Sequence, residues 1–179
     1  MQMDPLKVAV KLAEFTIANN FDGVNIDYND IPALQSGTAE AWLIFFFQEL
    51  REKLPDHTIV ATVKPSFCNK DHYSGGAYEK INQQVGHLID FYNVEYYTEE
   101  DTEFNTYNQI FIESIGSRGG TAVEQLVSNH GFQRNKIIVG KTASSTGLYN
   151  IGCVPPADLG SWTEKHYLDK GWYGGVSFW

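Results

Sequence analysis

The sequence predicts an α/β fold in which parallel strands alternate with crossover helices. Helical and strand-like patterns alternate along the whole chain, which begins with a helical pattern and ends with a strand pattern. About five segments have strand character. The length of 179 residues allows one domain of ordinary size, and 42% apolar residues are enough for a core. We therefore expect either an open doubly wound sheet or the later part of a (β/α)8 barrel, which as a whole needs eight strands and about 250 residues.

The first half of the chain divides into two helices and two strands. Asp4-Pro5 is typical of a helix start, and the apolar residues that follow recur at helical spacing. Apolar and polar residues alternate over 21–29, which predicts a strand. After a loop that is expected to reach position 38, a second helix runs to Pro55, which stops it. The β-branched segment 58–63 then predicts the second strand.

The second half continues the same alternation. Apolar residues at helical spacing between 78 and 88 predict a third helix, and a short helix is expected near Ile110. Thr121 and Glu124 have the spacing of a capping box that opens the next helix. Pro156 starts the last helix, which should end at Gly171. The remaining strands are expected over 89–97, 136–140 and 174–179.

Charge and composition exclude several classes of partner. The net charge is -9, from 22 acidic and 13 basic residues, which argues against nucleic acid and anionic membranes because phosphates attract basic surfaces. No apolar stretch approaches the roughly 20 residues of a membrane span, and the N-terminus has no signal-peptide pattern. Aromatic residues make up 14% of the chain. An acidic, aromatic-rich surface suits a neutral ligand that stacks on rings, such as a sugar.

Polar side chains share one face of the first predicted strand. Strand geometry places Asn25, Asp27 and Asn29 on one side and apolar residues on the other. Because helices flank a parallel strand, we expect both of its faces to be covered. Burying unpaired amides and carboxylates is costly, so the polar row predicts a site in a barrel lumen or crevice. A purely structural hydrogen-bond cluster is the alternative.

Two further segments carry candidate site residues. On the third predicted strand, Asn93, Glu95 and Tyr97 share a face. The last strand ends on Trp179, a flat apolar plate at the strand terminus, where parallel α/β folds collect their ligands. Phe67, which follows the second strand, is expected to add a stacking surface, with packing inside the loop as the alternative reading.

The first polar row also resembles a known signature. The segment 22–29, Asp-Gly-Val-Asn-Ile-Asp-Tyr-Asn, resembles the Asp-Gly-x-Asp-x-Asp-x-Glu motif on the fourth barrel strand of glycoside hydrolase family 18, the chitinases and related endoglycosidases. Segments similar to later parts of the short fungal-type members follow in order, at 73–78, 90–97, 137–141 and 171–179. The resemblance implies a single domain over 1–179 that corresponds to barrel strands four to eight and lacks the N-terminal part of the barrel. We therefore expect a fragment, a truncated gene product or one piece of a two-piece assembly.

The resemblance also implies a chemistry that this chain has altered. In the family, the last residue of the motif is a glutamic acid that protonates the glycosidic oxygen while the substrate's own acetamide attacks the anomeric carbon. Asn29 occupies that position here, and Asn25 occupies the first inward aspartate position. Asp27 is retained. A carboxamide has no proton to deliver near neutral pH, and general acid assistance is worth about 100- to 10,000-fold in rate.

Other family positions are partly kept. Tyr97 matches the tyrosine that holds the acetamide oxygen, and Trp179 matches the ring-stacking tryptophan of the eighth strand. Glu95 stands where short members usually carry glutamine, and Thr98 stands where they carry asparagine. The resemblance thus implies catalytic positions at Asp27, Asn29 and Tyr97, and a sugar-contacting surface around them.

Three functional hypotheses follow. The first is a chitinase-like protein that binds chitin or N-acetylglucosamine oligosaccharides and has lost hydrolysis. The second is a working chitinase in which Glu95 or Asp30 replaces the missing acid, so the sequence leaves enzyme status open. The third is a half-barrel that requires a second chain to supply the missing strands. The family resemblance implies an extracellular location.

No cofactor or metal is expected. None of the five histidines lies at metal-ligand spacing with a cysteine or a carboxylate. Cys68 and Cys153 could form one bridge or none, so they do not fix the redox compartment.

Overall fold

Five parallel strands form one open sheet in a computed structural model that describes residues 3–97, 104–117, 119–143 and 152–179. The sheet order is β1-β2-β3-β4-β5, so each strand pairs with the next one along the chain. A doubly wound sheet would reverse direction at a switch point, whereas a barrel adds strands in sequence. The order therefore confirms the barrel-type prediction. The strands are β1 Gly23–Asp27, β2 Thr58–Val63, β3 Phe91–Glu95, β4 Ile137–Lys141 and β5 Val176–Phe178.

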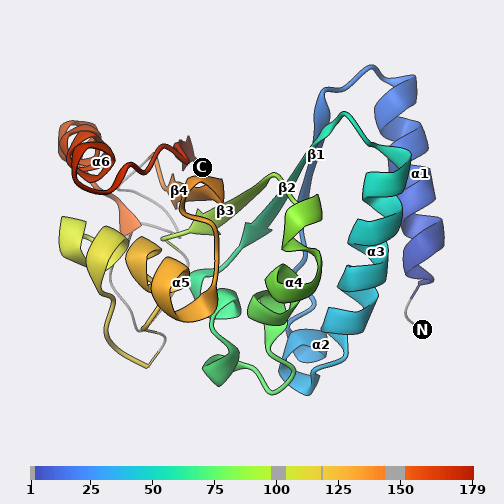
Figure 1. Cartoon of the computed structure of the whole chain (residues 1–179), viewed down its shortest axis with the longest axis horizontal. Helices are drawn as coiled ribbons and strands as arrows, with labels where there is room; N and C mark the ends of the chain where they lie inside the picture. The colour runs from blue at the N-terminus through green and yellow to red at the C-terminus, as the bar shows by residue number, and fades with distance from the viewer. Residues whose placement is uncertain (1–2, 98–103, 118, 144–151) are drawn as a thin grey trace.

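The helices follow one another alongside this sheet in chain order, from blue α1 to red α6 (Figure 1). Helix α1 packs against α3, and α3 packs against α4. On β2, β3 and β4, every second residue faces this helical layer and is buried there, as Ile59, Ala61, Tyr92, Val94 and Val139 show. The core is therefore the layer between helices and sheet. The longer helices are α1 Pro5–Ala18, α3 Ala39–Lys53, α4 Ala77–Val85, α5 Val123–His130 and α6 Pro156–Lys170.

The opposite face of the sheet is open at β1. Asn25 and Asp27 are exposed, whereas Val24 and Ile26, on the helix side, are half-buried. The expectation that both faces of this strand are covered is wrong for the described residues, because five strands do not close into a barrel. The polar row predicted from alternation lies on the face that would line a barrel lumen.

Three expectations about helices need correction. A short helix, α2 Ile31–Ser36, occupies the segment expected to be a loop, and the Asp30 side chain caps it by accepting from the Ala33 N–H at 3.1 Å. The predicted capping box at Thr121 is absent. Helix α5 begins at Val123, and the Gln125 amide oxygen accepts from the Ala122 N–H at 3.1 Å. The expected short helix near Ile110 is a π-helical turn, Asn108–Ile112.

One arginine binds the chain segments that lead into two strands. The Arg51 guanidinium, on α3, donates to the Leu88 carbonyl at 2.9 and 3.0 Å and to the His57 carbonyl at 2.8 Å. It also pairs with the Asp90 carboxylate at 2.6 Å, and that carboxylate accepts from the Ile59 N–H at 2.7 Å. Since His57 precedes β2 and Asp90 precedes β3, this planar cation fixes the start of both central strands.

Two simpler properties of the described residues complete the fold. None of their helices is long and apolar enough to span a membrane. Cys68 is buried and Cys153 is half-buried, and the disulfide bridge that the sequence left open is not formed between them.

Candidate functional site

The candidate site begins at the carboxyl end of β1. Asn29 lies just beyond the strand, and its amide nitrogen donates to the Asp27 carboxylate at 2.8 Å. Both side chains are exposed on the open face of the sheet. Asn29 is therefore a neutral donor that is directed at the neighbouring carboxylate.

A chain of hydrogen bonds joins this face across the sheet. The Thr62 hydroxyl, on β2, donates to the Asn25 side-chain oxygen at 2.7 Å and accepts from the Asn93 amide nitrogen, on β3, at 3.2 Å. The Asn93 side-chain oxygen in turn accepts from the Ser177 hydroxyl, on β5, at 2.5 Å. Sequence reasoning found Asn25 and Asn93 but missed Thr62 and Ser177. Both hydroxyls sit at alternating strand positions, which was the available signal.

The second predicted row lies on β3. The Tyr97 hydroxyl donates to the Glu95 carboxylate at 2.9 Å. Tyr97 is buried and Glu95 is half-buried. The two side chains named as neighbours from the sequence are thus brought into contact. Thr98 lies outside the described residues.

Of the two aromatic plates expected to stack on a sugar, one is exposed and the other is buried. The side chain of Trp179 is 76% exposed, and its backbone is held by hydrogen bonds to Lys141 and Ala143, both at 3.0 Å. Phe67 is only 2% exposed and packs edge-on against Tyr73, with ring centroids 5.3 Å apart. Phe67 therefore belongs to the core beneath the loop and has almost no free face for a ligand, which corrects its expected role.

Asp30, one of the two candidate replacement acids, is already engaged. Its carboxylate accepts from the Ala33 N–H as the cap of α2. Asp30 therefore serves as the side-chain cap of this helix. Glu95 is the remaining candidate on the open face.

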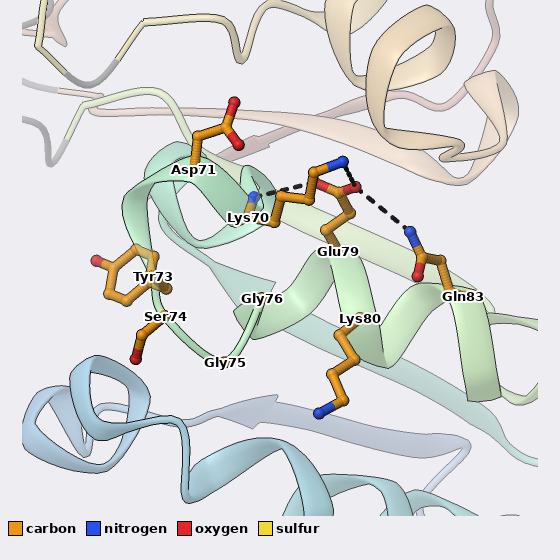
Figure 2. A pocket seen from close by; sticks show the side chains of 9 residues that line it. All are labelled: Lys70, Asp71, Tyr73, Ser74, Gly75, Gly76, Glu79, Lys80 and Gln83. Atoms are coloured by element: carbon orange, nitrogen blue, oxygen red, sulfur yellow. Dashed lines mark hydrogen bonds and ion pairs between the residues drawn. The ribbon is translucent and has the colours of Figure 1, made fainter.

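A separate pocket of about 430 Å³ lies between the loop that follows β2 and helix α4. In Figure 2, Lys70 and Gln83 reach towards Glu79, which forms one wall of the pocket. Glu79 accepts from the Lys70 N–H at 2.9 Å and from the Lys70 ammonium at 3.3 Å. Because these charges satisfy each other, and because none of the sequence-predicted site residues lines the pocket, we place the candidate site on the sheet face.

In the ranges that the structure describes, no group of three or more histidine, cysteine, aspartate or glutamate side chains is arranged to hold a metal ion. The candidate site accordingly consists of amides, hydroxyls, two carboxylates and an indole ring. These are groups that recognise neutral, hydroxyl-rich ligands by hydrogen bonding and stacking.

Comparison with known proteins identifies the fold. No protein-family model and no curated protein sequence matches the chain. Among solved structures, a GH18 chitinase from Pseudoalteromonas aurantia superimposes with a TM-score of 0.81 and 27% sequence identity, covering 98% of this chain and 62% of the chitinase. The chitinase ChiC of Aspergillus fumigatus gives a TM-score of 0.65 at 17% identity, over 94% of this chain and 53% of that one.

A family 18 chitinase from Crocus vernus is similar over the whole chain, with a TM-score of 0.62 and 15% identity, and 58% of that protein is covered. The chain thus spans between half and two thirds of the length of these chitinases. Its strand order, its alternating helices and these superpositions agree. The chain is a partial (β/α)8 barrel of the kind found in glycoside hydrolase family 18 chitinases.

Proposed function

We propose that residues 1–179 form a single chitinase-like domain that binds chitin or N-acetylglucosamine oligosaccharides without hydrolysing them. One observation carries the proposal: the Asn29 amide donates to Asp27 at 2.8 Å where the family motif has its acid. An amide cannot deliver a proton to the leaving oxygen, and losing general acid assistance costs about 100- to 10,000-fold in rate. An extracellular location would follow from this ligand.

Several groups on the open face support binding. Asp27 and Asn25 on β1 are exposed and can hydrogen-bond a sugar, and at the end of β3 the Tyr97 hydroxyl is bonded to Glu95. The Trp179 ring is exposed at a strand terminus, where a sugar ring could stack on it. Together these groups combine polar contacts with one aromatic platform, which is the usual composition of a small-ligand site.

Isothermal titration with chitin oligomers tests the proposal. We expect heat of binding with N-acetylglucosamine tetramers and none with glucose tetramers, which lack the acetamide. Trp179→Ala should weaken binding by about tenfold, since a stacked aromatic ring contributes about 0.5–1.5 kcal/mol beyond its buried area. Tyr173→Ala is the matched control, because Tyr173 is also exposed near the C-terminus. Absence of heat at millimolar tetramer would reject the proposal.

A working chitinase with a displaced acid is the second candidate, and Glu95 favours it. This carboxylate is half-buried on the open face and accepts from the Tyr97 hydroxyl. The measurement is release of a chromogenic leaving group from N-acetylglucosamine. Turnover that is abolished by Glu95→Gln would support this candidate, and turnover no faster than buffer rejects it.

A half-barrel completed by further strands is the third candidate. Among the described residues, no strand pairs with the outer edge of β1 or β5. Val176 and Phe178 on β5 are exposed apolar side chains, and so are Phe15 and Phe21 near β1. Open edges with apolar side chains favour pairing with additional strands, from the same polypeptide or from a second chain. A cooperative unfolding transition of the 179-residue chain alone would argue that no completion is needed.

A further inference from the structure

Three hydrogen bonds form a continuous relay on the open face of the sheet. Ser177 donates to Asn93, Asn93 donates to Thr62, and Thr62 donates to Asn25, at 2.5, 3.2 and 2.7 Å. We call these four side chains the polar relay. They lie on β5, β3, β2 and β1, so the relay links the two edge strands of the sheet.

The relay crosses β4 without a side chain from that strand. Gly140 pairs with Glu95 on one side and with Ser177 on the other. A β-carbon at Gly140 would lie 3.1 Å from the Asn93 side-chain oxygen and 3.3 Å from the Ser177 hydroxyl. The missing side chain therefore leaves the space in which Asn93 and Ser177 meet.

The relay has a direction. An amide side chain has one accepting end and one donating end, and a hydroxyl has a single hydrogen to donate. Asn93 presents its oxygen to Ser177 and its nitrogen to Thr62, so the Thr62 hydrogen is directed at the Asn25 oxygen. Among the described residues, none accepts from the Asn25 amide nitrogen, and Asn25 is exposed.

We propose that Ser177 is a positioning residue for Asn25. Through Asn93 and Thr62, its hydroxyl fixes the orientation of the Asn25 amide. The amide oxygen accepts from Thr62, and the NH2 group is left to face a ligand. The ligand atom that Asn25 recognises is then a hydrogen-bond acceptor, such as a sugar hydroxyl or carbonyl oxygen. Two residues away, the Asp27 carboxylate can only accept. The edge strand thus offers a donor and an acceptor side by side. The sugar identity of the ligand rests on the proposed function, whereas the relay does not.

Side-chain amide NMR tests the relay without any ligand. In a 15N-labelled chain, Ser177→Ala should shift the side-chain NH2 signals of both Asn93 and Asn25, and Ser177→Thr, which keeps the hydroxyl, should restore them. Ser161→Ala is the matched control: its hydroxyl donates to the Asp158 carbonyl on α6, outside the relay.

A double-variant comparison shows whether the effect passes through Thr62. Thr62→Val keeps the side-chain shape but removes the hydroxyl. In that background Ser177→Ala should still shift the Asn93 signals and should no longer affect those of Asn25. Either of two results overturns the inference. The first is that the Asn25 side-chain signals do not shift in Ser177→Ala. The second is that Ser177→Ala shifts them equally in the wild-type and Thr62→Val backgrounds.

Titration with N-acetylglucosamine tetramers gives the second readout. Ser177→Ala should weaken binding by about 3- to 10-fold, the range expected when one hydrogen bond is lost from a site, and Ser177→Thr should recover the affinity. If the wild-type chain binds the tetramer and Ser177→Ala binds it with the same affinity, the positioning role of Ser177 is wrong and the proposed function still stands. If the wild-type chain binds no tetramer, the proposed function fails, and the NMR result alone decides on the relay.

Discussion

The Glu79 carboxylate accepts a hydrogen bond from the His130 ring at 2.8 Å in the interior of the protein, where both side chains are buried. The second ring nitrogen of His130 lies 3.0 Å from the Gly120 carbonyl oxygen. Both ring nitrogens of His130 therefore face a hydrogen-bond acceptor. The pair ties α4 to the end of α5 and to the segment before it.

Breaking this pair should destabilise the chain strongly. Burial works to raise the pKa of Glu79, but hydrogen bonds from the Lys70 N–H, from His130 and from the Lys70 ammonium bring that pKa below its ordinary value of 4.5. The carboxylate therefore contributes stability above about pH 4.5, and this is lost as the pH falls through its folded pKa. Glu79→Gln should lower the free energy of unfolding by on the order of 3 kcal/mol at pH 7 and flatten its acid dependence.

Chemical denaturation of the two forms between pH 3 and pH 7 measures the effect. Glu52→Gln is the control, because that carboxylate is 70% exposed in its pair with Lys53 and should contribute little. A Glu79→Gln loss no larger than that of Glu52→Gln would show that the buried pair is not stabilising.

Lys141 should make stability rise with pH above neutrality. Its ammonium is 1% exposed and donates to the Tyr96 and Phe104 carbonyls at 2.6 and 2.7 Å. Burial lowers the pKa of Lys141 to about 7. Between that value and the ordinary 10.5, the unfolded chain binds a proton that the folded chain does not. The folded state therefore gains stability as the pH rises through this window.

Comparing wild type with Lys141→Met at pH 7 and pH 9 isolates this contribution. The wild-type free energy of unfolding should increase relative to the variant by on the order of 2–3 kcal/mol over those two pH units. Lys7→Met, at an exposed position on α1, should show no such difference. Parallel pH profiles for wild type and Lys141→Met would contradict a depressed pKa.

Two glycines should respond oppositely to alanine. A β-carbon at Gly140 would lie 2.9 Å from the Val94 carbonyl oxygen and would separate Asn93 from Ser177, so Gly140→Ala should cost about 1–3 kcal/mol. Gly160, in α6, has nothing within 4 Å of the same added atom. Gly160→Ala should therefore stabilise by up to about 1 kcal/mol through its higher helix propensity. Thermal unfolding of both variants checks the contrast, which would be refuted by equal shifts.

Replacing Asn29 with an acid tests the lost-hydrolysis hypothesis. Asn29→Glu returns a proton donor to the end of β1, and we expect some hydrolysis of a chromogenic N-acetylglucosamine substrate. Asn29→Gln has the same size but no acidic proton, so it should stay inactive. Equal rates for the two variants would mean that more than the acid is missing.

Much of the fold could be predicted because the determinants of its elements are local. The alternating pattern before Asn29 and the β-branched run over 58–63 give β1 and β2, and Asp4-Pro5 gives the start of α1. Helix α2 was missed although Asp30 and Pro32 carry a start signal, because its six residues leave no periodic pattern. Glu124 misled the helix-start prediction: its partners are the side chains of Arg134, at 2.8 Å, and His166, at 3.1 Å, and not a backbone N–H.

The site was predictable only where neighbours in sequence are neighbours in space. The contact of Asn29 with Asp27 and that of Tyr97 with Glu95 each join the last residue of a strand to the residue two positions further along the chain. The burial of Phe67 depends on how its loop folds, and the contact of Asn93 with Ser177 spans 84 residues. Such contacts depend on strand register and on a missing side chain between strands, which periodicity alone does not reveal.

The order of the strands has a consequence for biosynthesis. Each of β2 to β5 leaves the ribosome after the strand beside which it will lie, so none has to insert between two that are already in place. The sheet can therefore lengthen in one direction while translation continues, one strand and its helix at a time. If translation pauses within one of the helices between the strands, the strands already made can form a narrower sheet with the same topology. The next strand can then add to its edge.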